Sequence, residues 1–310
     1  MVTVYQHIKE ELRSVQEIGL DTWIQVTAPS HTEVKRLCEQ GGVPLEFITS
    51  ALDPDERPRI EHEDNFTLIL LRIPLPNDEH AEIPFLTLPL SIIIAPRFII
   101  TVCTKPNSVI ADFIETKVRN FLIENKNRFV LQIVNRTVLK YLNYLKEINH
   151  QTALLERQVH SALKNEDLIR LMRYEKSLVY FLASLRTNQL MLERLRKSET
   201  LRLSLEDKEF LEDIAIDNTQ ALEMTNIYKS ILSNLAATFS SIISNNLNQE
   251  MKTLTTVTII LMVPTLVTGF YGMNVGLPWQ DSPYIFIVIT TFCILMGSLG
   301  IVVLSVRKLF

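Results

Sequence analysis

The sequence predicts an α+β domain followed by a long helical hairpin, a stalk helix and two C-terminal transmembrane helices. Strand-like runs rich in Ile, Leu and Val occur within residues 1–115. Between residues 205 and 270 the only glycine is Gly269 and the only proline is Pro264, so one helix can occupy most of this stretch. Residues 255–270 and 284–306 are apolar, and the second run has the length of a bilayer crossing.

The length and composition favour a soluble domain with a membrane part and argue against a nucleic-acid-binding or secreted protein. The 310 residues are enough for one soluble domain with a membrane part, and the net charge of −4 gives no electrostatic support for nucleic-acid binding. The first 20 residues include the charged residues Lys9, Glu10, Glu11 and Arg13 and have no apolar core, so they do not resemble a signal peptide. We therefore expect the soluble domain in the cytoplasm. The scattered cysteines Cys38, Cys103 and Cys293 also fit a reducing compartment.

Residues 1–115 are predicted to form the cytoplasmic α/β domain. Alternating or continuous apolar residues indicate strands at 22–27, 59–61, 66–73, 86–94 and 98–103. Helices are expected at 31–40, ended by Gly41-Gly42, and at 44–52. The prolines at 74, 76, 84, 89 and 96 suggest that several strands lie at sheet edges. No Gly-rich phosphate loop or catalytic Ser/His or Cys/His pairing is recognisable, so the sequence gives no support for an enzyme.

Residues 116–204 are expected to form a long antiparallel hairpin of helices. Leucine and isoleucine recur at helical spacing within 129–163 and again within 167–203. The polar residues 164–166 separate these two amphipathic runs and mark the turn of the hairpin.

The predicted stalk helix, residues 205–271, continues into the first transmembrane helix and carries a polar seam. Steps of four and three residues backward from Gly269 define this seam, whose members are Thr265, Met262, Thr258, Thr255, Met251, Asn248, Ser244, Ser241, Ala237, Asn234 and Ser230. Polar side chains in a membrane tend to face a bundle interior or a water-filled path, which several copies of the helix would have to enclose. Small residues also pack helices together, so the seam alone leaves both interpretations open.

The region around this seam resembles a known family. The patterns that carry the resemblance are Asn248-x-x-Met251-Lys252-x-Leu254-Thr255 and Met262-x-x-Thr265-x-x-x-Gly269-x-Tyr271-Gly272-Met273-Asn274. They resemble the signature of the CorA family of magnesium transport proteins, in which the Gly-Met-Asn triplet lies between two C-terminal transmembrane helices. The resemblance implies a homopentameric channel that takes up Mg²⁺ across the plasma membrane and is gated by cytoplasmic Mg²⁺.

The resemblance also implies roles for individual residues. Gly272, Met273 and Asn274 would form the ion-selectivity loop, in which five Asn274 amides hold the hydrated ion through its water shell. The implied pore-lining residues are Asn248, Met251, Leu254, Thr255, Thr258, Met262, Thr265 and Gly269. Their threonines offer hydroxyl groups, whereas their Met and Leu side chains form a constriction that gates by dewetting.

The first turns of the stalk helix are acidic, and two of their carboxylates suggest a metal site. Asp213 and Asp217 are four residues apart on one helix face, where like charges repel and a divalent cation would relieve the repulsion. The same acids also fit a solvated charge run near a helix N-terminus. The family resemblance implies that Asp213 binds a regulatory Mg²⁺ across the subunit interface. We take Asp78 and Glu79, in a loop between strands, as candidates for the acid from the neighbouring subunit.

Charge asymmetry predicts the membrane topology. The loop of residues 272–283, which contains Gly-Met-Asn, has no Lys or Arg, whereas Lys252 precedes the first crossing and Arg307 and Lys308 follow the second. The positive-inside rule then places both termini in the cytoplasm and the loop outside. Ser282-Pro283 supplies an N-cap and a first-turn proline for the second transmembrane helix at 284–306.

Two other functions remain open from the sequence. A zinc, cobalt or nickel transporter of the same superfamily would have the same layout, and Co²⁺, Ni²⁺ and Zn²⁺ are therefore kept beside Mg²⁺ as possible ions. These softer ions prefer Cys and His ligands, which the seam lacks. A membrane-anchored coiled-coil interaction protein would explain the heptad spacing and the anchor, but not a polar seam through the membrane.

Overall fold

The computed structural model describes residues 1–8, 11–78, 81–118, 121–158, 165–198, 201, 203–276, 278 and 282–306. The chain divides into two compact units, Met1–Ala236 and Ala237–Phe310, and the boundary falls inside helix α6 (Leu205–Tyr271). Each unit has its own packing, so the two are described in turn.

The first unit contains a mixed sheet, which among the described residues has seven strands in the order β2-β1-β3-β7-β6-β5-β4. Neighbouring strands are antiparallel except β3 and β7, which run parallel with Trp23 opposite Ile99. The strands are β1 (Val2–Ile8), β2 (Glu11–Val15), β3 (Thr22–Thr27), β4 (Arg59–Glu63), β5 (Phe66–Pro76), β6 (Phe85–Ile94) and β7 (Phe98–Cys103).

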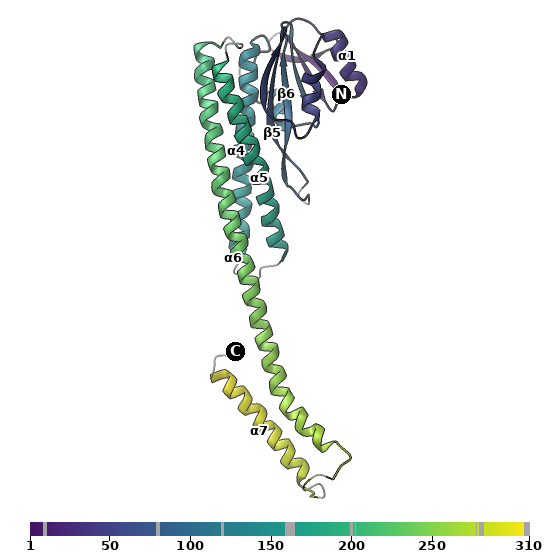
Figure 1. Cartoon of the computed structure of the whole chain (residues 1–310), viewed down its shortest axis with the longest axis vertical. Coiled ribbons are helices and arrows are strands. Elements are labelled where there is room, and N and C mark those ends of the chain that lie inside the picture. The colour runs from purple at the N-terminus through teal and green to yellow at the C-terminus, as the bar shows by residue number, and fades with distance from the viewer. Residues whose placement is uncertain are drawn as a thin grey trace. The chain divides into compact units, whose positions relative to one another are not determined.

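Helices cover both faces of this sheet (Figure 1). Successive side chains of a strand point to opposite faces, so Trp23 and Ile24 belong to different cores. The Ile24 core is closed by α1 (His31–Gly41) and α2 (Leu45–Thr49). The Trp23 core is closed by α3 (Ser108–Ile114), α4 (Lys126–Gln158) and α5 (Asn165–Lys197). Burial on both faces explains the continuous apolar runs of the central strands.

The expected helices of this region are confirmed. Helix α1 begins with a capping box in which the backbone N–H of Glu33 donates to Ser30 and the Glu33 carboxylate accepts from the Ser30 backbone. It ends at Gly42, whose φ of 67° lies in the left-handed region that glycine adopts without strain. The second predicted helix is present as α2 with a short 3₁₀ turn at Ser50–Leu52.

The prediction that the proline-containing strands lie at sheet edges is wrong, although their prolines do lie on stretches that, among the described residues, lack a neighbouring strand on one side. Strands β5 and β6 lie inside the sheet, yet they contain Pro74, Pro76 and Pro89. The β4 ladder reaches only Leu70 of β5, and the β7 ladder reaches only Leu90 of β6. Beyond those points the two strands pair only with each other in the sheet, so each has one edge free of ladder bonds and tolerates proline.

The helical hairpin is formed by α4 and α5, which pack on this two-stranded extension and on the sheet (Figure 1). The Tyr141 ring of α4 meets the Phe181 ring of α5 edge-on, with centroids 5.0 Å apart. The second arm was expected to continue to residue 203 but ends at Lys197. The next helix begins after Ser204, whose hydroxyl caps it by accepting the backbone N–H of Asp207.

Candidate functional site

In the second unit, one face of α6 packs against α7 (Ile285–Val306). The less exposed positions of α6 there are Thr256, Ile260, Pro264 and Val267, whose spacing of four and three residues defines a single helix face. A Cβ atom added to Gly300 of α7 would lie 3.6 Å from Cγ1 of Ile260. This is ordinary contact range, so Gly300 lies beside Ile260 and α7 lies on this face of α6.

The predicted polar seam lies on the opposite face of α6. Each residue turns the helix by about 100°, so Thr258 and Met262, each two residues from Ile260, point about 200° away from the α7 contact. All the predicted pore-lining residues are exposed in the isolated chain: Asn248, Met251, Leu254, Thr255, Thr258, Met262, Thr265 and Gly269. Helix α7 therefore leaves the whole seam uncovered.

The threonine hydroxyls of the seam donate their protons to backbone carbonyl oxygens of the same helix. Oγ1 of Thr255 donates to the carbonyl oxygen of Met251 at 2.7 Å, and Oγ1 of Thr258 donates to that of Leu254 at 2.8 Å. Thr265 donates in the same way to the carbonyl of Leu261, also at 2.8 Å. A hydroxyl has one proton and two lone pairs. Because the proton of each threonine is donated to the backbone, the side facing away from the helix can only accept hydrogen bonds.

Helix α6 ends at Tyr271, directly before the Gly-Met-Asn triplet. The backbone N–H of Gly272 donates to the Thr268 carbonyl at 2.9 Å, and that of Met273 donates to the Phe270 carbonyl at 3.2 Å. A Cβ atom on residue 272 would lie 3.3 Å from the Thr268 oxygen, a tight contact that glycine avoids. The turn leaves the Met273 and Asn274 side chains exposed just past the helix end.

Some of the acidic side chains at the start of α6 form ion pairs with other helices, and others are exposed to solvent. Asp207 is buried, accepts from Ser204 in the N-cap and pairs with Arg128 of α4 at 3.1 Å. Glu212 pairs with Arg196 of α5 at 2.6 Å. Asp213 is exposed and Asp217 is half-buried. Neither ion pair was predicted, because Arg128 and Arg196 come from other helices.

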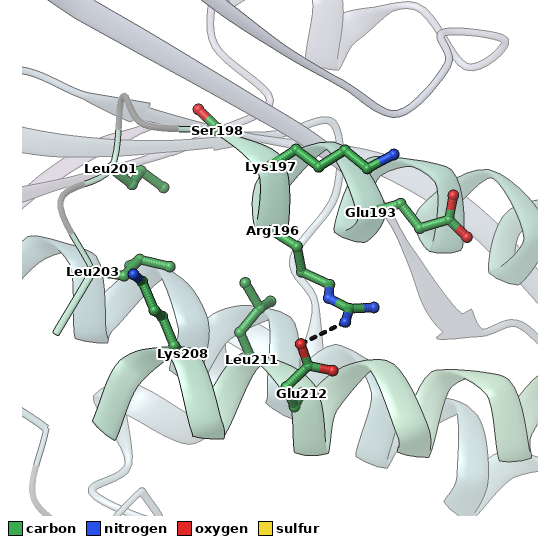
Figure 2. A pocket seen from close by; sticks show the side chains of 9 residues that line it. All are labelled: Glu193, Arg196, Lys197, Ser198, Leu201, Leu203, Lys208, Leu211 and Glu212. Atoms are coloured by element: carbon green, nitrogen blue, oxygen red, sulfur yellow. Dashed lines mark ion pairs between the residues drawn. The ribbon is translucent and has the colours of Figure 1, made fainter. Parts of the chain in front are cut away.

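The Arg196–Glu212 pair spans a cavity of about 560 Å³ between the end of α5 and the start of α6. Figure 2 shows the two side chains pointing toward each other, with Leu211 beside Glu212. The pair is half-exposed and adds little stability, whereas Leu211 and Ile214 of the same turns are buried in the Trp23 core and hold the start of α6 against the hairpin. The position of Asp213 in the first unit is therefore set by the buried residue next to it, Ile214.

The candidate metal ligands do not gather within one chain. Asp78 is exposed in the loop after β5, where its carbonyl accepts from the backbone of Ala81, and Glu79 lies outside the described residues. Across the ranges that the structure describes, no three His, Cys, Asp or Glu side chains form a group able to hold a metal ion. Mg²⁺ commonly keeps several waters and takes only one or two carboxylates. Asp213 and Asp217 alone fit such a site only with water or with ligands from another copy.

Known proteins share this arrangement. The chain is 29% identical to the cobalt/magnesium transport protein CorA of Methanocaldococcus jannaschii over 266 residues, which are 84% of this chain and 82% of that protein. It is 23% identical to the protein of the same name from Thermotoga maritima, covering 86% of this chain and 76% of that one. The complete structure of the CorA magnesium transporter from M. jannaschii superposes with a TM-score of 0.75 at 25% identity, over 98% of this chain and 97% of that chain.

A family model described as the CorA-like Mg²⁺ transporter protein matches residues 22–308, which include the sheet from β3 onward, the hairpin, α6, the Gly-Met-Asn turn and all of α7. The chain therefore belongs to the CorA-like Mg²⁺ transporter family.

Proposed function

We propose that this protein is a homopentameric channel that carries Mg²⁺ across the plasma membrane, with Co²⁺ as a second permeating ion. The observation that carries the proposal is the position of the polar seam on the face of α6 opposite α7. When several copies assemble with α7 outside, this face surrounds a central path. The relatives named above are described as cobalt/magnesium transport proteins, which supports these two ions.

Selection in this channel takes place at Asn274. Mg²⁺ sheds its inner water reluctantly, so a ring of neutral amides recognises the ion through hydrogen bonds from its first-shell water. Neutral groups bind the ion without holding it too tightly to leave, which conduction requires. Gly272 permits the tight turn past the helix end, and Met273 braces the loop beside it.

The path below Asn274 combines polar and apolar positions. Thr265, Thr258 and Thr255 offer hydroxyl oxygens to the water shell. Met251, Leu254 and Met262 are exposed on the same face and form the constriction that closes by dewetting. The channel is thus gated by apolar side chains without a charged plug.

Two crossings place both termini on the same side of the membrane, and Lys252, Arg307 and Lys308 make that side the cytoplasm. By length and composition, α6 is the one described helix that qualifies outright as a membrane span, and α7 is apolar over its described side chains, Ile285–Gly300. The 22 residues of α7 measure about 33 Å, close to the thickness of the hydrocarbon core. The Gly-Met-Asn turn then faces the outside.

Cytoplasmic Mg²⁺ regulates this channel at Asp213. The side chain is exposed on α6, where a carboxylate of a neighbouring copy can approach it, and Asp217 follows one turn later. Asp78 is our candidate for the neighbour's acid. A bound Mg²⁺ screens the like charges and favours the closed ring, so uptake limits itself.

Uptake into liposomes tests the proposed function. The purified full chain should accumulate Mg²⁺ inside vesicles that hold a Mg²⁺-sensitive dye, and external Co²⁺ should compete. Parallel assays with Ni²⁺ and Zn²⁺ test the other ions, and native mass spectrometry should report five subunits. Accumulation of Zn²⁺ or Ni²⁺ without Mg²⁺ uptake would reject the assignment of the ion, and accumulation of none would reject the channel.

A further inference from the structure

We infer that Thr258 is a specificity-determining residue of the proposed channel, keeping the apolar constriction wet by offering an oxygen that only accepts hydrogen bonds. This inference rests on the proposed function and refines it. It concerns the narrow part of the seam, where hydrated ions meet the least polar side chains.

The position of Thr258 within the seam is the first step. One turn before it lies Leu254 and one turn after it lies Met262, with exposed fractions of 61% and 62%. Residues four apart are neighbours on one helix face, so the three side chains form a continuous strip in which Thr258 is the polar break. Narrow paths lined entirely by apolar side chains tend to lose their water. A hydroxyl ring at this level counters that tendency.

The polarity of the hydroxyl is the second step. Oγ1 of Thr258 donates its proton to the Leu254 carbonyl at 2.8 Å, so only lone pairs face away from the helix. Water bound to a cation points its hydrogens outward, and these hydrogens need acceptors. Water bound to an anion presents its oxygens outward and needs donors, which Thr258 has already used. The wall at this level therefore favours ions that pass as hydrated cations.

The chain provides a matched control in Thr253. Its hydroxyl donates to the Gln249 carbonyl at 3.0 Å, and it is also exposed, so its local chemistry equals that of Thr258. It lies seven residues from Ile260, about 20° from the face that α7 contacts. A substitution there removes the same hydroxyl without touching the seam.

Unitary currents in planar bilayers test the inference, because they report conduction per channel and not channel abundance. Thr258→Val keeps the shape of the side chain and should lower the unitary Mg²⁺ current by about tenfold, since each subunit loses an acceptor in the constriction. Thr258→Ser restores the hydroxyl and should stay within about twofold of wild type, as should Thr253→Val.

Two results would overturn the inference while leaving the proposed function intact. One is a Thr258→Val channel that conducts Mg²⁺ like wild type, and the other is an equal loss in Thr253→Val. If the wild-type protein itself carries no Mg²⁺ current, the proposed function fails, and that outcome is visible before any variant is compared.

Discussion

The carboxamide of Asn188 on α5 pairs with both backbone polar groups of Arg72 on β5. The Arg72 N–H donates to Oδ1 of Asn188 at 2.9 Å, and Nδ2 of Asn188 donates to the Arg72 carbonyl at 2.8 Å. This contact occurs just beyond Leu70, where the β4 ladder stops. The side chain of one helix thus replaces the missing strand, and it couples the hairpin to the sheet.

Asn188→Ala should therefore destabilise the protein. The Arg72 carbonyl would keep the Tyr141 hydroxyl as a donor at 3.0 Å, but its N–H would be left without this acceptor in a site where Asn188 is now 3% exposed. We expect a loss of about 1–3 kcal/mol, seen as a lower thermal unfolding midpoint of the detergent-purified chain. Asn143→Ala, at an exposed position of α4, is the control. Equal midpoints for the two variants would contradict this account.

A second buried contact fixes α3 to α4 and predicts a dependence on pH. Asp112 is buried and accepts from Arg136 and Lys140, each at 2.6 Å. Burial alone would raise the pKa of Asp112, but hydrogen bonds from Lys140 and Arg136 and their positive charges outweigh it and hold the pKa below its ordinary value of 3.8. A lowered pKa means that the folded state prefers the carboxylate.

The stability that Asp112 supplies is complete above about pH 4 and is lost as the pH falls through the lowered pKa of the folded state. Asp112→Asn should cost about 2 kcal/mol at neutral pH, and the difference from wild type should shrink in acid. Thermal unfolding measured at several pH values checks this, with the exposed Asp55→Asn as control. A difference that stays constant down to pH 3 would show that packing, not charge, is responsible.

Periodicity and chain breakers were sufficient to predict much of the fold. Apolar runs marked β3 to β7, and the stretch without Gly or Pro marked α6. Strands β1 and β2 were missed, because Val4 is the one buried residue of β1 and β2 has none. Such strands are stabilised by pairing with their neighbours, which the local sequence does not record.

For the candidate site, the sequence predicted which residues share a helix face but not what lies opposite that face. The heptad spacing was enough to group Thr258 with the rest of the seam, but not to show that the seam lies opposite α7. That relationship depends on which face of α6 receives Gly300. Likewise the acidic run did not reveal that Asp207 and Glu212 are already paired, since Arg128 and Arg196 are distant in sequence.

Removal of the Asn274 amide should abolish selective divalent uptake. In the proposed channel the Asn274 side chain is exposed past the helix end and contributes to the ion path, not to a core. Asn274→Ala should therefore remain folded and pentameric, with Mg²⁺ uptake into liposomes reduced to background. Val275→Ala, at the next exposed position, provides a control for changes in the loop. Unchanged uptake by Asn274→Ala at equal protein content would refute this role.

Cysteine labelling should distinguish the seam from the other faces of α6. Single cysteines at Asn248, Met251, Thr255 and Thr258 should react in the open channel with a small water-soluble thiol reagent, because the path there is wet. Cysteines at Val257, Ile260 and Val263 should be protected by α7 or by lipid. The variants are best made in a background without the native cysteines. Uniform labelling around the helix would mean that the seam does not line a path.

Cytoplasmic Mg²⁺ should protect the closed channel through Asp213. An ion shifts the equilibrium only by its difference in affinity for the closed and open states. A site that binds at about 1 mM contributes about 4 kcal/mol on the standard scale, and equivalent interfaces add to this. Mg²⁺ should therefore slow digestion of the wild-type protein by chymotrypsin.

Variants at Asp213 separate charge from ligation. Asp213→Lys places a fixed positive charge where the ion would sit, so protection should persist without Mg²⁺, and chymotrypsin does not cleave at the new lysine. Asp213→Ala removes the carboxylate ligand and should lower the sensitivity to Mg²⁺. Glu193→Ala, at an exposed acid of α5, should behave as wild type. Full Mg²⁺-dependent protection of Asp213→Ala would mean that the regulatory ion binds elsewhere in the channel, because this variant lacks the proposed ligand.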